Sequence, residues 1–144
     1  MVDADKKIEN VIREGSVFYF ADDAFFNEKP HYYVVLNHNP LKDIILILVY
    51  ASSFDSDIYL SIEDSPFPNE TYIDVTPQEC SIFNRVSIFD CNRVFERNID
   101  IFIEKFRSRK LKSYGYIEKN ILVRLRDAVL KSPAVAERIK KLLE

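Results

Sequence analysis

Glycine is almost absent from this sequence, which contains two glycines, Gly15 and Gly115. Glycine-rich phosphate loops and the dinucleotide-binding fingerprint each need several closely spaced glycines, because the backbone must approach the phosphates. Neither motif can be written with these two residues. Nucleotide-binding enzymes of both types are therefore excluded.

Cysteine and histidine are equally scarce, at two residues each. Two thiols without further pairs do not make a disulfide framework, so Cys80 and Cys91 are expected to be free and buried. Together with His31 and His38 they could supply four metal ligands, but they lack the close-paired spacing of a zinc site. The sequence therefore predicts neither a metal nor another cofactor.

Long apolar runs are also missing. The longest extends from Ile44 to Ala51 and is too short to span a bilayer, and the start MVDADKKIENV has no apolar core of a signal peptide. We therefore expect no membrane contact and a cytoplasmic location. The 144 residues, 47% of them hydrophobic and 30% charged, suit one globular domain with its own core.

The net charge of −3 conceals a division along the chain. Residues 1–80 hold 5 Lys and Arg against 15 Asp and Glu, whereas residues 81–144 hold 15 against 8. The densest basic stretch is KFRSRKLKS, with Lys105, Arg107, Arg109, Lys110 and Lys112. Such a stretch fits phosphate contacts along an RNA backbone, and it equally fits a solvated loop or helix end.

A predicted β-hairpin between residues 29 and 53 organises the chain. Two runs rich in β-branched and aromatic residues, 32–36 and 44–50, flank a segment whose Asn and Pro residues signal a turn. Both runs are nearly continuous in apolar residues rather than alternating. Each strand is therefore expected to be covered on both faces, as in a barrel or a tightly curled sheet.

The ends of this hairpin are polar and form the candidate site. Lys29, Pro30 and His31 lead in, and Ser52 and Ser53 lead out. Antiparallel strands joined by a short turn bring their far ends together, so these five residues should lie close in space. Histidine titrates near pH 6.5 and suits a general base or acid at neutral pH, although a lone His beside a strand is more often structural.

The rest of the chain predicts a mainly β fold with C-terminal helices. We expect five to seven short antiparallel strands forming a small barrel within residues 14–103, and helices within 116–144, in a single domain of residues 1–144. The Phe25 and Phe26 pair in the loop after the first strand is either buried or a contact surface. Ser132 and Pro133 suit the N-cap and first position of a last helix. The other expected elements are a short helix within 3–13 that ends at Gly15, strands at 15–20, 57–62, 71–76, 80–83, 86–90 and 93–95, and an amphipathic helix at 116–131.

The order of three motifs is similar to the start of the MazF/PemK family of toxins. They are GSVFYF, then KPHYYVVLN, then IILILVYASS, and the later segment RVSIFDCNRVFERN resembles a strand near the end of that family's barrel. The resemblance covers roughly residues 14–131. It implies an SH3-like small antiparallel barrel of the MazF/PemK/CcdB type, usually a homodimer with an antitoxin partner.

The resemblance also implies a metal-independent endoribonuclease that cleaves single-stranded RNA and leaves 2′,3′-cyclic phosphate ends. In the family, an Arg before a Pro and a Thr or Ser after the third strand carry much of the chemistry. Those positions match Lys29 and either Ser52 or Ser53. His31 is a candidate base or acid beside them.

Lys29 departs from the family pattern, because lysine offers one mobile charge where arginine binds phosphate through two parallel hydrogen bonds. Two alternatives to the enzyme therefore stay open. One is a catalytically silent barrel that binds nucleic acid or protein through its basic stretch. The other is an interaction module of a toxin-antitoxin or defence system that uses its acidic loop or the Phe25 and Phe26 pair.

Overall fold

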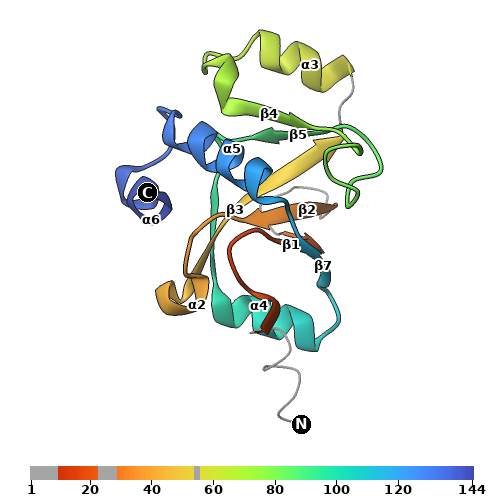
Figure 1. Cartoon of the computed structure of the whole chain (residues 1–144), viewed down its shortest axis with the longest axis vertical. Helices are drawn as coiled ribbons and strands as arrows, with labels where there is room; N and C mark the ends of the chain where they lie inside the picture. Colours follow the sequence, from red (N-terminus) through yellow and green to blue (C-terminus); the bar gives the residue numbers. More distant parts are fainter. Residues whose placement is uncertain (1–9, 23–28, 54–55) are drawn as a thin grey trace.

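The computed structural model describes residues 10–22, 29–53 and 56–144, and for residues 56–59 the course of the backbone only. A seven-stranded antiparallel sheet forms its centre, with helices on both faces (Figure 1). The elements are β1 (Ser16–Ala21), β2 (Pro30–Val35), α2 (Pro40–Asp43), β3 (Ile45–Ser53), α3 (Ser56–Glu63), the 3-10 turn η1 (Asn69–Thr71), β4 (Tyr72–Val75), β5 (Ser87–Asp90), β6 (Phe95–Asn98), α4 (Ile99–Arg107), β7 (Lys112–Tyr116), α5 (Lys119–Leu130) and α6 (Glu137–Leu143).

The strand order is β4-β5-β3-β2-β1-β7, and β6 pairs with β3 beside β5. β3 holds the sheet together because its first half pairs with β6, its second half with β5, and its other edge with β2. Among the described strands no pairing joins β4 to β7, so the sheet is curled but not closed. The predicted fold class, mainly antiparallel β with C-terminal helices, is confirmed.

The hairpin strands are covered on both faces, as their continuous apolar runs predict. Val34 and Val49 face a core that includes the apolar stripe of α5, whereas Tyr33 and Leu48 face a second core that includes Phe102 of α4. All five side chains are fully buried.

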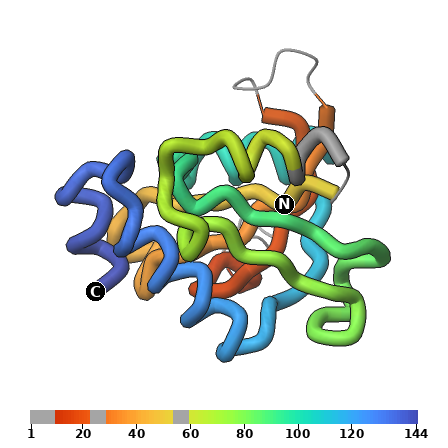
Figure 2. Tube along the Cα trace, turned by 90° about the horizontal axis from the view of Figure 1, so that it is seen from above, coloured from red at the N-terminus to blue at the C-terminus, as the bar shows by residue number. Residues whose placement is uncertain are grey.

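Figure 2 shows α3 and α5 on opposite sides of β4, and the Arg124 guanidinium of α5 donates a hydrogen bond to the Asp74 carbonyl oxygen of β4 at 3.1 Å.

Residues 57–62, predicted to be a strand, form most of helix α3 instead. A strand would place Leu60 and Ile62 on one face, but Leu60 is 56% exposed while Ile62 is half-buried. Short runs of alternating apolar residues fit either a strand or a helix, and in the described structure these residues form a helix that pairs with no strand. The prediction of a strand was therefore wrong.

Two further local predictions were wrong. Residues 80–83 form turns, in which Cys80 and Phe83 are buried and the Phe83 amide donates to the Cys80 carbonyl oxygen at 3.3 Å. Ser132 does not cap the last helix, which begins at Glu137. Its hydroxyl is buried and donates to the Asn92 Oδ1 at 2.6 Å, so Ser132 joins the turn after α5 to the turn after β5.

Helix α4 and strand β7 were not predicted. The Asn98 side chain caps α4 by accepting a hydrogen bond from the Asp100 amide at 2.7 Å. The exposed sequence of β7, KSYGY, lacks the apolar alternation that reveals a strand. Most of the predicted helix within 3–13 and the Phe25 and Phe26 pair lie outside the described residues. Within the described residues, no helix has the length and apolar composition to cross a membrane.

Candidate functional site

The polar ends of the hairpin lie together, as their order in the sequence predicts. Lys29, Pro30, His31, Ser52 and Ser53 line one open groove of about 650 Å³. Lys29 and Ser53 are exposed, while His31 and Ser52 are half-buried. The predicted residues therefore bring one cation, one imidazole and two hydroxyls to the groove at the open end of the hairpin.

The register of the hairpin decides which face each side chain takes. Tyr32 lies opposite Ala51 and Tyr33 lies opposite Tyr50. Because side chains alternate along a strand, His31 and Ser52 share the face of Tyr50, and Ser53 shares the face of Tyr32. The groove thus wraps around the end of the two strands and takes one hydroxyl from each face.

The surroundings of His31 hold its ring in one tautomer. The Nδ1 atom lies 2.8 Å from the Lys29 carbonyl oxygen, which accepts hydrogen bonds only, so in the neutral ring Nδ1 carries the proton and Nε2 the lone pair. The ring packs edge-on against Tyr50 with 5.2 Å between ring centroids. Burial is the main cause that lowers the pKa of His31. The hydrogen bond to the Lys29 carbonyl oxygen raises this pKa in part, and the charges of Lys29 and Arg93 lower it. His31 is therefore a neutral base at pH 7.

Arg85 and Asn84 also line the groove, and the sequence analysis missed both. Arg85 is exposed and lies two residues before Ser87, which pairs with Ser53 across β5 and β3. The guanidinium of Arg85 thus comes to the same groove as the Lys29 ammonium from a distant part of the chain. Only the strand order brings the two cations together. The one signal in the sequence was the position of Arg85 directly before the predicted strand 86–90.

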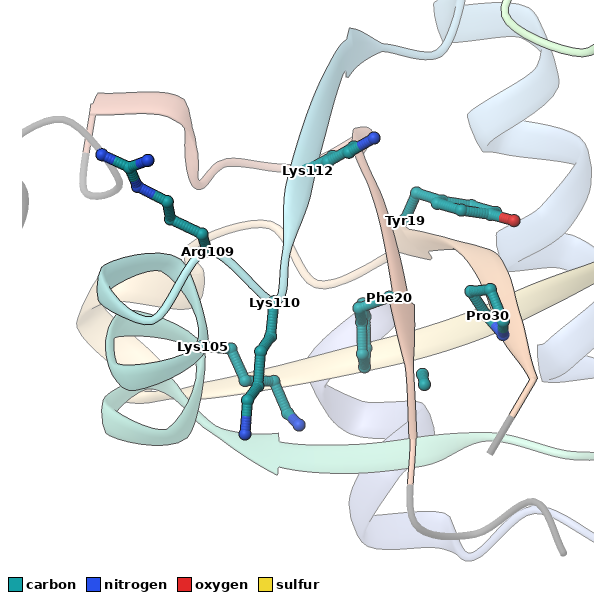
Figure 3. A pocket seen from close by; sticks show the side chains of 8 residues that line it. Tyr19, Phe20, Pro30, Lys105, Arg109, Lys110 and Lys112 are labelled. Atoms are coloured by element: carbon teal, nitrogen blue, oxygen red, sulfur yellow. The ribbon is translucent and has the colours of Figure 1, made fainter. Parts of the chain in front are cut away.

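The basic stretch meets this groove instead of forming a separate surface. Lys105, Arg109, Lys110 and Lys112 line a second open cavity of about 470 Å³. This cavity also contains Tyr19 and Pro30, and both of these residues line the groove as well. Figure 3 shows Lys105 and Lys110 on one side of β1 and Tyr19 on the other, with Arg109 directed away from them.

Arg107 is the one member of the basic stretch outside this cavity. Its Nη1 atom lies 3.8 Å from the Glu104 carboxylate one turn earlier in α4. A partly solvated pair of this kind contributes little to stability. Arg107 is exposed on the outer surface of the helix.

Asp22, directly after β1, is neutralised inside the fold. Asp22 is buried, and its carboxylate accepts hydrogen bonds from the Arg97 Nε at 2.8 Å and the Arg97 Nη2 at 2.5 Å. An ion pair bound through both oxygens offers little negative charge to the surroundings. Asp22 therefore does not repel an anion in the groove.

No group of three or more His, Cys, Asp or Glu side chains is arranged to hold a metal ion within the residues that the structure describes. Cys80 and Cys91 are free and buried, as predicted. Burial raises the pKa of both thiols, so neither is a thiolate at neutral pH. His38 lies at the turn end of the hairpin, where its Nε2 is 3.2 Å from the Leu143 carbonyl oxygen.

Comparisons with known proteins give a structural match without a sequence match. No family model matches the chain, and no curated protein matches it by sequence. One similar solved structure is an endoribonuclease in complex with its cognate antitoxin from a mycobacterial species, with a TM-score of 0.53, 10% identity, and coverage of 82% of this chain and 90% of that chain.

Two crystal structures of MazE-MazF from Deinococcus radiodurans are also similar. Form II gives a TM-score of 0.51 and 10% identity over 83% of this chain and 91% of that chain. Form III gives a TM-score of 0.52 and 9% identity over 83% of this chain and 92% of that chain. At this identity the likeness establishes the fold and not the activity. The chain has the fold of MazF-like toxins.

Proposed function

We propose that this protein is a MazF-like endoribonuclease that cleaves single-stranded RNA without a metal and leaves 2′,3′-cyclic phosphate ends. The groove at the open end of the hairpin carries this proposal. There, two cations, a neutral imidazole and two hydroxyls line one cavity: Lys29, Arg85, His31, Ser52 and Ser53. These are the groups that transfer of a phosphoryl group to a neighbouring hydroxyl requires.

In the reaction, the ribose 2′-oxygen forms a bond to the adjacent phosphorus and the bond from phosphorus to the 5′-oxygen breaks. The Nε2 atom of His31 takes the proton of the 2′-hydroxyl, since Nδ1 already holds a proton toward the Lys29 carbonyl oxygen. The Arg85 guanidinium holds the charged phosphate oxygens. Lys29 gives a proton to the departing 5′-oxygen, because an ammonium can lose a proton whereas a guanidinium cannot.

Arg85 can supply what Lys29, in place of the family's arginine, lacks. A lysine cannot bind phosphate through two parallel hydrogen bonds, and in this proposal Arg85, from the turn before β5, makes that contact. Ser52 and Ser53 stand at the end of β3, where a hydroxyl can donate to a phosphate oxygen. The basic cavity around Lys110 and Lys112 extends the same positive surface, which suits the continuing RNA strand.

The proposal includes the partners of such a toxin. The similar mycobacterial endoribonuclease is in complex with its cognate antitoxin, which supports an antitoxin protein as the partner of this chain. We further propose a homodimer. Sedimentation of the purified chain, alone and with the product of a neighbouring open reading frame, tests both assemblies.

The decisive experiment is incubation of the purified chain with a long single-stranded RNA of mixed sequence in EDTA, followed by mapping of the RNA ends. We expect discrete cuts with 2′,3′-cyclic phosphate ends. Lys29→Ala is expected to slow cleavage by about 10²- to 10³-fold, the usual cost of losing one group that stabilises the transition state. Lys42→Ala is the matched control, because Lys42 is exposed at the opposite end of the same hairpin.

Two results would contradict the proposal. One is RNA that stays intact, and the other is cleavage at the same rate in Lys29→Ala and Lys42→Ala. Intact RNA that nevertheless shifts on a native gel would favour a silent barrel that binds nucleic acid.

A further inference from the structure

Three tyrosines from three different strands form an aromatic cluster between the groove and the basic cavity. Tyr19 of β1, Tyr32 of β2 and Tyr114 of β7 are neighbours in pairs, with ring centroids 4.7 Å apart for Tyr19 and Tyr32, 5.3 Å for Tyr32 and Tyr114, and 6.1 Å for Tyr19 and Tyr114. We name these three residues the tyrosine triangle. It closes only because the sheet places β1 between β2 and β7.

The tyrosine triangle packs on the core at Tyr32 and is open to solvent at Tyr114. The Tyr32 ring meets the buried Phe83 ring edge-on, with 5.4 Å between centroids, so the core supports the cluster. Tyr114 is 40% exposed, and Tyr19 and Tyr32 are half-buried. Burial raises the pKa of Tyr32, so this hydroxyl is neutral at pH 7 and does not repel an anion.

Cations surround the tyrosine triangle on two sides. Lys112 lies directly opposite Tyr19 in the pairing of β1 and β7, which puts both side chains on one face, and Figure 3 shows them there. On the other side, Tyr19 and Tyr32 line the groove together with Lys29 and Arg85. Aromatic pairs across strands also stabilise sheets, but that role requires neither exposure nor neighbouring cations.

We propose that the tyrosine triangle is a stacking platform for the bases of single-stranded RNA, placed between the phosphate-binding groove and the basic cavity. This inference rests on the proposed function and names the subsite that holds the RNA strand beside the cleaved phosphate. Aromatic rings accept any base by stacking, while the cations beside them follow the backbone. Tyr114 is the most exposed ring and is expected to make the main contact.

The test measures binding of a short single-stranded oligonucleotide with 2′-O-methyl riboses, which cannot be cleaved, by fluorescence anisotropy at fixed salt. Tyr114→Ala is expected to raise the Kd by about tenfold, within the usual cost of removing one stacking ring. Tyr114→Phe should bind like the wild type, since stacking needs the ring and not the hydroxyl. The matched control is Tyr116→Ala on the same strand, because Tyr116 is 37% exposed but its ring lies 3.4 Å under the Arg13 guanidinium.

A second probe separates bases from phosphates. An oligonucleotide with several abasic positions keeps its backbone charge, so it should bind more weakly than the intact oligonucleotide and equally to the wild type and Tyr114→Ala. Equal affinity of the wild type and Tyr114→Ala for the intact oligonucleotide would overturn the platform, as would a change of oligomeric state in Tyr114→Ala with unchanged RNA affinity.

The two proposals can fail separately. Cleavage in EDTA by a wild type and a Tyr114→Ala variant of equal RNA affinity would retain the enzyme and remove the platform. Weakened binding in Tyr114→Ala, with a wild type that never cleaves, would retain the platform and remove the enzyme.

Discussion

The two ends of the central hairpin use polar residues in opposite ways. At the turn end Asn37 is fully buried, and its amide nitrogen donates to the Asp43 carboxylate at 3.0 Å and to the Ile45 carbonyl oxygen at 2.8 Å. Its amide oxygen accepts from the Ile47 amide at 3.1 Å. At the open end, Lys29 and Ser53 are exposed in a groove.

This difference separates polar residues that stabilise the fold from polar residues that are available to a ligand. A buried polar group that satisfies all of its hydrogen bonds within the chain holds the fold together, and its loss costs stability. An exposed cation in a concave site contributes little to stability and is placed for a ligand. Changes at the turn end should therefore alter unfolding alone, and changes at the open end should alter RNA cleavage alone.

The two histidines test this contrast most strongly. His31→Gln at the open end is expected to slow RNA cleavage by about 10²- to 10⁴-fold, the usual contribution of a general base. His38→Gln at the turn end should leave the rate within twofold or so, because His38 serves a structural contact with Leu143. Initial rates with the same RNA measure both, and equal rates would remove His31 from the reaction.

The pH dependence of cleavage sharpens the role of His31. A general base works when it is deprotonated, and burial lowers the pKa of His31 below its ordinary value of 6.5. The rate should therefore be level near pH 7 and fall about tenfold per pH unit only below the lowered pKa. A limb centred above pH 6.5 in a profile of kcat/KM would contradict this assignment.

Asn37→Ala should weaken the fold without touching the chemistry. It leaves the Ile47 amide without its side-chain acceptor, and the free energy of unfolding should fall by about 2 kcal/mol. Urea denaturation measures the change, and cleavage at a temperature where both proteins are folded should be equal. Asn39→Ala is the matched control: Asn39 is exposed and makes no side-chain cap to α2, so stability should stay within about 0.5 kcal/mol.

The smallest expected effect distinguishes the two serines. Ser53 shares the face of Tyr32 and lies opposite Ser87, near Arg85, so Ser53→Ala should slow cleavage by about tenfold through one lost hydrogen bond to phosphate. Ser52→Ala should have less effect. Single-turnover rates compare the two variants, and a larger loss in Ser52→Ala would show that Ser52, which shares a face with His31, makes the main contact with the phosphate instead of Ser53.

The hairpin and its polar ends were predictable because they depend on neighbouring residues. The apolar runs, the turn signalled by Asn and Pro, and antiparallel pairing together bring Lys29 to Ser53. The helix at 57–62 was not predictable, because its short alternating apolar run fits two secondary structures and the rest of the fold selects one. Arg85 was missed for another reason: its place in the groove depends on β5 pairing with β3.

The sequence by itself determined the antiparallel sheet, the C-terminal helices and the cluster at the open end of the hairpin, since local periodicity and short connections specify them. Only the tertiary structure decided that the basic stretch meets this cluster and that three tyrosines close into one platform. Tyr19, Tyr32 and Tyr114 are separated widely along the chain, and the order of β2, β1 and β7 in the sheet makes them neighbours. Long-range strand order is a property of the packed core, which no local pattern specifies.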